Sequence, residues 1–118
     1  MNIQDWTLYY DNFGPLSCQA PCTMYSVLYD HGKIPDPFYG TNERELQYLA
    51  EKDCVFESVF SAPPALFTRE HIELVFHGLD TICHIYLNGA DITLFAKVHA
   101  EPFARLCTSG APPAAAVL

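Results

Sequence analysis

The chain has 118 residues, of which 50% are hydrophobic and 14% aromatic, and this composition favours one packed domain over a disordered chain. Its 14 acidic side chains against 6 basic ones leave a net charge of -8, with no basic stripe to neutralise phosphates. We therefore expect neither a nucleic acid nor a membrane as a partner.

The amino-terminal residues and the cysteines favour a cytoplasmic protein. Residues 1–6 include an acid and lack both a positive n-region and a long apolar run, so no secretory signal is predicted. No run of about 18 apolar residues predicts a membrane span. Five cysteines, an odd number, fit reduced thiols better than a disulfide framework. They are Cys18, Cys22, Cys54, Cys83 and Cys107.

The first predicted elements are a strand and a short helix. Residues 6–10 are rich in aromatic side chains and predict a strand, which the turn residues of 11–15 then end. Over residues 23–29 the apolar positions recur at helical spacing. Thr23 is the expected N-cap of this helix and Gly32 its stop.

A proline-rich loop is predicted next. Pro35 and Pro37 fix their own φ angles and disfavour helix in the residues before them. We therefore expect residues 33–39 to form an extended loop that holds Phe38 and Tyr39 in place.

A second helix and a further strand follow the loop. Thr41, followed by acidic residues, has the pattern of a capped helix start, and Leu46 and Leu49 are expected to face the core. The helix would be brief. Residues 55–60 alternate in an apolar-rich pattern of period two, which predicts a strand.

The remaining elements are predicted to be strands. Residues 71–76 and 81–87 are rich in β-branched and aromatic side chains and predict neighbouring strands. Residues 88–89, Asn-Gly, favour a type I′ turn, which would lead the chain into another strand at 92–96. Several short strands with one or two short helices indicate an all-β antiparallel sandwich. Residues 108–118 have the alanine- and proline-rich composition of a flexible tail.

One segment carries a family resemblance. Residues 33–46 combine a rigid proline turn, an aromatic pair and a polar helix start. Together with residues 21–28, 51–60 and 78–89, they resemble in order and spacing the amino-terminal sugar-binding domain of β-mannosidases of glycoside hydrolase family 2. The resemblance implies a jelly-roll β-sandwich of the galactose-binding type over residues 1–107, before the tail.

The resemblance is weaker toward the carboxyl end. Residues 97–103 match the family only poorly. A complete jelly roll needs about eight strands, whereas the sequence predicts five or six. We therefore expect an incomplete sandwich, whose exposed sheet edge would favour self-association.

The resemblance also implies a function. In this family the amino-terminal domain does not carry the chemistry; it braces a (β/α)₈ barrel that hydrolyses terminal β-mannosides. Retaining glycosidases need two carboxyl groups about 5–5.5 Å apart, and no pair of acids here has a spacing assignable to that role. No barrel fits into 118 residues. We assign no catalytic residue and no cofactor, and expect the barrel of the parent enzyme or a carbohydrate as the partner.

Two other functions remain open. One is a free-standing carbohydrate-binding module, and the other is a fragment without independent function. For a binding module, the candidate residues form an aromatic and polar platform for a sugar ring. They are Phe38, Tyr39, Asn42 and Tyr48. The alternative for the same loop is packing against the sandwich and against the following domains of a full-length enzyme.

No metal site is predicted. Cys18 and Cys22 lie four residues apart and could be combined with His31 and His84. Zinc sites of this kind usually show a second close pair of ligands, which this sequence lacks. We interpret the two cysteines as small buried hydrophobic side chains.

Overall fold

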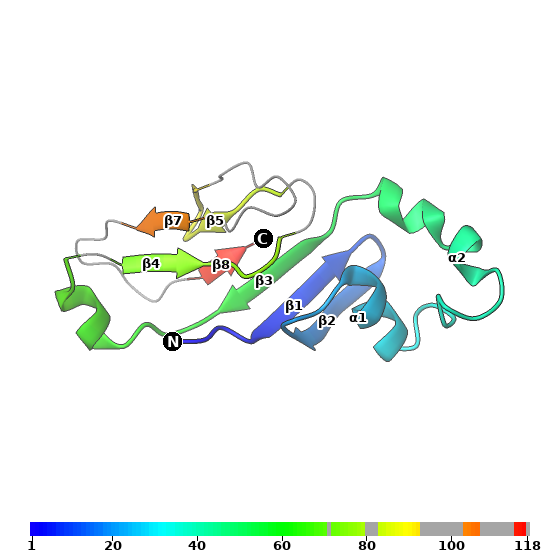
Figure 1. Ribbon diagram of the computed structural model, residues 1–118, viewed down its shortest axis with the longest axis horizontal. Coiled ribbons are helices and arrows are strands. Elements are labelled where there is room, and N and C mark those ends of the chain that lie inside the picture. Colours follow the sequence, from blue (N-terminus) through cyan, green and yellow to red (C-terminus); the bar gives the residue numbers. More distant parts are fainter. Residues whose placement is uncertain (71, 80–82, 93–102, 107–114, 118) are drawn as a thin grey trace. The chain divides into compact units, whose positions relative to one another are not determined.

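Short antiparallel strands dominate the computed structural model, with few short helices (Figure 1). The structure describes residues 1–70, 72–79, 83–92, 103–106 and 115–117. The chain forms two compact units, Met1–Ser58 and Val59–Leu118. The predicted all-β class is confirmed. No helix in the described part of the chain is long and apolar enough to cross a membrane.

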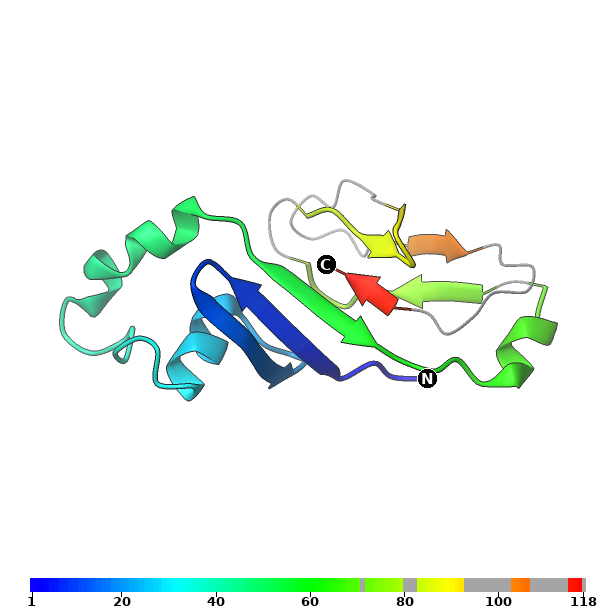
Figure 2. The same ribbon diagram turned by 180° about the vertical axis from the view of Figure 1, so that it is seen from behind.

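A β-hairpin is the centre of the first unit (Figure 2). Strand β1 (Asp5–Tyr10), predicted from its aromatic residues, pairs antiparallel with β2 (Phe13–Gln19). The chain reverses at Asp11, whose φ of 45° lies in the left-handed region that a tight turn requires. On its other side β1 pairs antiparallel with β3 (Val55–Val59), another predicted strand.

Strand β2 corrects the sequence analysis, which placed a turn over residues 11–15. Leu8 pairs with Leu16 and Tyr10 pairs with Phe13, so two residues of β2 lie opposite Tyr9 alone. These two residues are Gly14 and Pro15. The pair forms a β-bulge, an insertion that leaves the strand continuous. Because β2 is an edge strand, a proline without an N–H group is tolerated there.

Helix α1 (Met24–Asp30) begins and ends where the sequence predicts. The Thr23 hydroxyl accepts a hydrogen bond from the Ser26 backbone N–H at 3.1 Å, and the Ser26 hydroxyl accepts one from the Thr23 N–H at 2.9 Å. This reciprocal pair is a capping box, which satisfies two otherwise unpaired N–H groups. Gly32 ends the helix with a φ of 65°, a conformation that glycine adopts without strain.

The core of the first unit joins the hairpin, α1 and the segment that follows the loop. Its buried members are Leu8, Tyr10, Leu16, Val27, Leu28, Ile34, Leu46 and Leu49. The predicted burial of Leu46 and Leu49 is therefore confirmed. The Tyr10 hydroxyl donates a 2.9 Å hydrogen bond to the Leu49 carbonyl, which ties the 3₁₀-helix η1 (Gln47–Glu51) to the hairpin.

Helix α2 (Asn42–Glu45) is a single turn. Thr41 occupies its N-cap position, as predicted, but the threonine side chain makes no capping hydrogen bond. The reason is its backbone: a ψ of 13° differs from the extended conformation that turns an N-cap hydroxyl toward the first turn.

The second unit contains a 3₁₀-helix and five short strands within its described ranges. They are η2 (Pro64–Thr68), β4 (Ile72–Val75), β5 (Tyr86–Leu87), β6 (Ala90–Asp91), β7 (Phe103–Leu106) and β8 (Ala115–Val117). β5 pairs antiparallel with β6 and with β8. Asn88 and Gly89, with φ angles of 51° and 79°, connect β5 to β6, so the predicted Asn-Gly turn is confirmed.

The predicted neighbour of strand β4 is wrong. The sequence analysis expected residues 71–76 to lie beside residues 81–87, but β4 pairs antiparallel with β7 instead. Ile72 lies opposite Leu106 and Val75 opposite Phe103, some thirty positions later in the chain.

Some expectations fall outside the described residues. These include most of the strand expected at residues 92–96, most of the weak match at 97–103, and the thiol of Cys107. Most of the tail, residues 108–114 and 118, also falls there. Within the tail, Ala115–Val117 forms β8. The division into a domain at 1–107 and a tail at 108–118 stays a prediction.

Candidate functional site

The loop between α1 and α2 has a buried anchor and an exposed tip. Ile34 is part of the core of the first unit, whereas Phe38, Tyr39 and Gly40 are exposed. Residues 33–39 contain neither helix nor strand, as predicted from their prolines. The tip is therefore exposed to solvent, while the start of the loop is fixed in the core by Ile34.

Asp36 organises the tip through hydrogen bonds to three residues. Its carboxylate oxygen Oδ1 accepts from the Phe38 backbone N–H at 2.9 Å. Its backbone carbonyl accepts from the Tyr39 N–H at 3.2 Å and from the Asn42 side-chain amide at 2.9 Å. An aspartate that bonds the backbone two residues on is a common turn device. The bonds restrict the conformations open to Phe38 and Tyr39.

The candidate aromatic side chains are unusually open to solvent. Phe38 exposes 97% of its surface, Tyr39 76% and Tyr48 54%. Phe38 therefore does not pack against the described part of this chain, whereas Ile34 of the same loop packs into the core. Sugar contact and packing against other domains both stay predictions.

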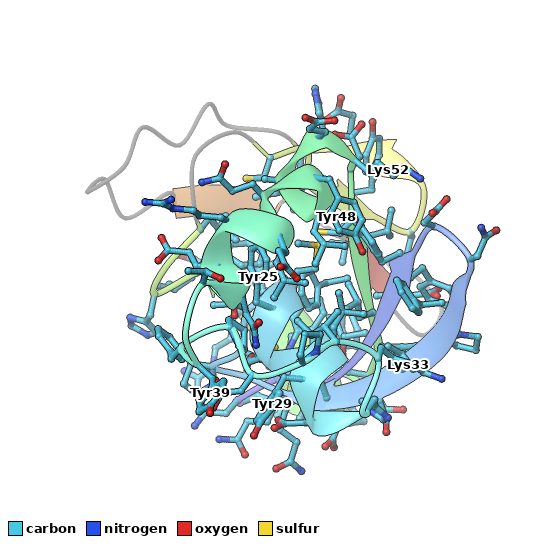
Figure 3. The ribbon with its side chains drawn as sticks, turned by 90° about the vertical axis from the view of Figure 1, so that its right-hand side faces the viewer. Tyr25, Tyr29, Lys33, Tyr39, Tyr48 and Lys52 are labelled. Carbon is cyan, nitrogen blue, oxygen red and sulfur yellow. The ribbon has the colours of Figure 1, made fainter. Side chains whose placement is uncertain are left out.

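The structure brings three of the four candidate residues together. Phe38, Tyr39 and Asn42 meet around Asp36, while Tyr48 belongs to η1. In the view of Figure 3, Tyr39 and Tyr29 are labelled at the lower left, and Tyr48 is labelled nearer Lys52.

Sequence reasoning missed two residues of this region. The first is Asp36, whose position between two prolines is a turn signal that we did not use. The second is Tyr29, which leaves 47% of its surface exposed at the end of α1. Its position beside the helix stop, on the side opposite the buried Val27, would have indicated its exposure.

The described residues show no arrangement typical of a glycosidase acid/base pair. A carboxylic acid used for that purpose has its pKa raised, commonly by an apolar environment. Among the residues whose burial the structure describes, Ser58 is the only buried polar one. An ion pair joins Lys52 to Asp11 at 2.7 Å, and both side chains are exposed. The hydrogen bond to Asp11 raises the pKa of Lys52.

The described cysteines are free thiols. They are Cys18, Cys22, Cys54 and Cys83. Burial raises the pKa of the Cys18 thiol to about 12, with smaller contributions from the neighbouring Cys22. The Cys18 thiol donates a 3.5 Å hydrogen bond to the Trp6 carbonyl. No group of three or more histidine, cysteine or acidic side chains in the described ranges could hold a metal ion.

We expect Cys18 to be alkylated slowly while the chain is folded. A pKa raised to about 12 keeps its thiolate fraction at neutral pH well below that of an ordinary thiol, and the thiolate is the reactive form. Iodoacetamide labelling with peptide mass spectrometry should give a Cys18 rate that rises about tenfold per pH unit in mild alkali. In urea the rate should approach that of an ordinary thiol. Equal rates in the folded and unfolded chain would contradict the partial burial of Cys18.

Comparison with known proteins gives a family match and several relatives. The family model described as "Glycosyl hydrolase 2 galactose-binding domain-like" matches residues 5–102. "Beta-mannosidase B" of Thermothelomyces thermophilus is 40% identical over 80 residues, which are 68% of this chain and 9% of the relative. "Beta-mannosidase" of Mus musculus is 29% identical over 77 residues, 65% of this chain and 9% of the relative.

A solved structure has the same fold. The β-D-mannosidase from Dictyoglomus thermophilum superimposes with a TM-score of 0.85 at 24% sequence identity. The match covers 99% of this chain and 15% of that protein. This chain thus spans less than a sixth of the length of each of these three proteins.

Proposed function

Because the chain belongs to the glycosyl hydrolase 2 galactose-binding-like domain family, we propose that it serves as a non-catalytic domain that braces the catalytic barrel of a β-mannosidase-like enzyme. The family match and the shared fold confirm the galactose-binding-like β-sandwich that the sequence resemblance implied. The reaction of the intact enzyme would be the hydrolysis of terminal β-mannosides.

One observation carries this proposal: the match covers most of this chain but only a small part of each relative. Residues 5–102 fit the family model, whereas the aligned region is 9% of the T. thermophilus β-mannosidase B. A domain that occurs within a much longer enzyme has the rest of that enzyme as its most direct partner.

A domain exchange tests the proposal. In the T. thermophilus β-mannosidase B, the region that corresponds to residues 5–102 is replaced by these residues. We expect the chimera to hydrolyse p-nitrophenyl β-mannoside, because the exchanged domain braces the barrel without supplying its carboxylates. The matched control carries an unrelated β-sandwich domain of similar length and should be inactive. A chimera as inactive as this control would overturn the proposal.

A second candidate function is a carbohydrate-binding module. The high exposure of Phe38, Tyr39 and Tyr48 favours it, since sugar rings stack on solvent-accessible aromatic faces. This function requires an affinity for mannose or a β-mannoside in the millimolar range or better. Titration of the chain, followed by backbone amide shifts, separates the two functions: shifts confined to residues 38–48 support a binding module, and unchanged, well-dispersed peaks support the brace.

A further inference from the structure

Phe38 is an exposed apolar side chain that the fold of the first unit does not explain. It leaves 97% of its surface in solvent, more than any other large hydrophobic residue in the described part of the chain. Tyr39 beside it is 76% exposed. Single exposed hydrophobic residues are common, but two consecutive aromatic residues at the tip of one loop expose more apolar surface than one.

Hydrogen bonds within the loop restrict the backbone conformation of Phe38 and Tyr39. The Asp36 carboxylate accepts from the Phe38 N–H, and the Asp36 carbonyl accepts from the Tyr39 N–H and the Asn42 amide. Ile34 fixes the start of the loop in the core. A side chain whose backbone is already ordered loses less conformational freedom on binding, so rigidity of this kind favours a docking role.

The segment that carries the aromatic tip is acidic. Within residues 29–51, five exposed side chains carry negative charge and two carry positive charge. The acids are Asp30, Asp36, Glu43, Glu45 and Glu51, and the bases are Lys33 and Arg44. Charges of opposite sign that face each other around the apolar centre of an interface speed association and disfavour wrong partners. The complementary surface would therefore have an apolar pocket with lysine and arginine at its rim.

We propose that Phe38 and Tyr39 anchor a docking surface for polypeptide, and that the occupant is the remainder of the same enzyme, through an apolar pocket with a basic rim. This inference rests on the proposed function, in which this domain is a small part of a longer chain. Buried aromatic residues at the centre of an interface contribute most of the binding energy.

The side chain of Phe38 favours polypeptide over sugar as the occupant. Phe38 has no polar atom in its side chain to bond a hydroxyl group, and it is the most exposed large hydrophobic residue in the described part of the chain. The Asn42 amide already donates one hydrogen bond to the Asp36 carbonyl. Phe38 is thus better suited to filling an apolar pocket than to binding a polar ring.

The test uses the full 118-residue chain in trans. A tagged chain is coexpressed with T. thermophilus β-mannosidase B from which the 80 matching residues have been deleted. We expect the wild-type chain to retain this truncated enzyme, and Phe38→Ala to retain at least about tenfold less. The control Val59→Ala removes a side chain that is 76% exposed and lies outside the loop, and should retain as much as wild type. Retention should also fall as salt is added.

Two further measurements, the melting temperature of the isolated chain and the thermal half-life of the chimera, separate a loss of docking from a loss of folding. The isolated Phe38→Ala chain should melt at the wild-type temperature, because an exposed side chain adds little to folding, so lost retention reports docking. In the chimera described above, Phe38→Ala should shorten the half-life of β-mannosidase activity on heating, whereas Val59→Ala should not.

The outcomes separate this inference from the proposed function. The chimera could be active while Phe38→Ala changes neither the retention of the truncated enzyme by the tagged chain nor the half-life of the chimera. This result would overturn the docking surface and leave the proposed function intact. A wild-type chain that fails to retain the truncated enzyme would also overturn the docking surface. An inactive chimera would overturn the proposed function, and the docking inference with it. Amide shifts at Phe38 on adding a β-mannoside would replace the polypeptide with a sugar as the occupant.

Discussion

Replacing Leu28 with alanine is expected to lower the free energy of unfolding of the first unit by about 2–5 kcal/mol, the range found when large apolar side chains are removed from well-packed cores. Leu28 is fully buried in α1, in the cluster that includes Leu8 and Leu49. The substitution removes its contacts and leaves a cavity. Urea denaturation, followed by the fluorescence of the only tryptophan, Trp6, measures the loss because Trp6 lies buried in β1 of the same unit.

The neighbouring residue provides a matched control for this substitution. Tyr29→Ala changes the next position of the same helix, where 47% of the side chain is already in solvent. We expect the free energy of unfolding to change by no more than about 0.5 kcal/mol, as for most surface positions. Similar losses for Leu28→Ala and Tyr29→Ala would show that α1 does not pack through the face on which Leu28 lies.

Removing the Tyr10 hydroxyl is expected to have the second-largest effect. The buried Tyr10 hydroxyl donates to the Leu49 carbonyl at 2.9 Å, so Tyr10→Phe leaves that acceptor without this donor. The loss of one partner from a buried hydrogen bond typically costs about 1–3 kcal/mol. The same urea titration measures the change.

Tyr9→Phe is the control for Tyr10→Phe. Tyr9 lies next to Tyr10 on β1 but is exposed, and a hydrogen bond with Glu57 raises its pKa. Water can take the place of the exposed Tyr9 hydroxyl as a hydrogen-bond partner of Glu57. This substitution should therefore leave the urea midpoint of unfolding nearly unchanged. If the two phenylalanine variants unfold at the same urea concentration, the Tyr10 bond does not stabilise the connection between η1 and the hairpin.

Elements specified by local chemistry were predictable from the sequence. The helix between Thr23 and Gly32 is bounded by a capping box and a left-handed glycine, both of which depend on a few adjacent residues. The turn at Asn88 and Gly89 likewise needs only two residues that accept positive φ. Such signals do not depend on the rest of the chain.

Features that depend on distant partners were not predictable. A glycine followed by a proline usually indicates a turn, and only the pairing of β2 with β1 reveals that Gly14 and Pro15 form a bulge in an edge strand. In the same way, the pairing of β4 with β7 joins segments far apart in sequence, while the pattern of each strand specifies only its own faces.

The candidate site was predictable in its outline and not in its details. The prolines indicated a fixed loop that carries Phe38 and Tyr39, and the structure has this loop. The exposure of the two side chains depends on which other residues pack into the core. The amino-acid composition does not indicate that packing. The hydrogen bonds of Asp36 depend on backbone angles that its own residue type does not determine.

The bulge in β2 bears on how copies of the chain behave at high concentration. The outer side of an edge strand can act as a template on which further chains add as strands, the route by which many sheet proteins aggregate. Pro15 offers no N–H group to an added strand, and the bulge that it forms with Gly14 bends and twists β2 away from the flat geometry that stacking needs. If copies of this chain do associate edge to edge, as its sequence suggested, β2 is poorly suited to start that assembly.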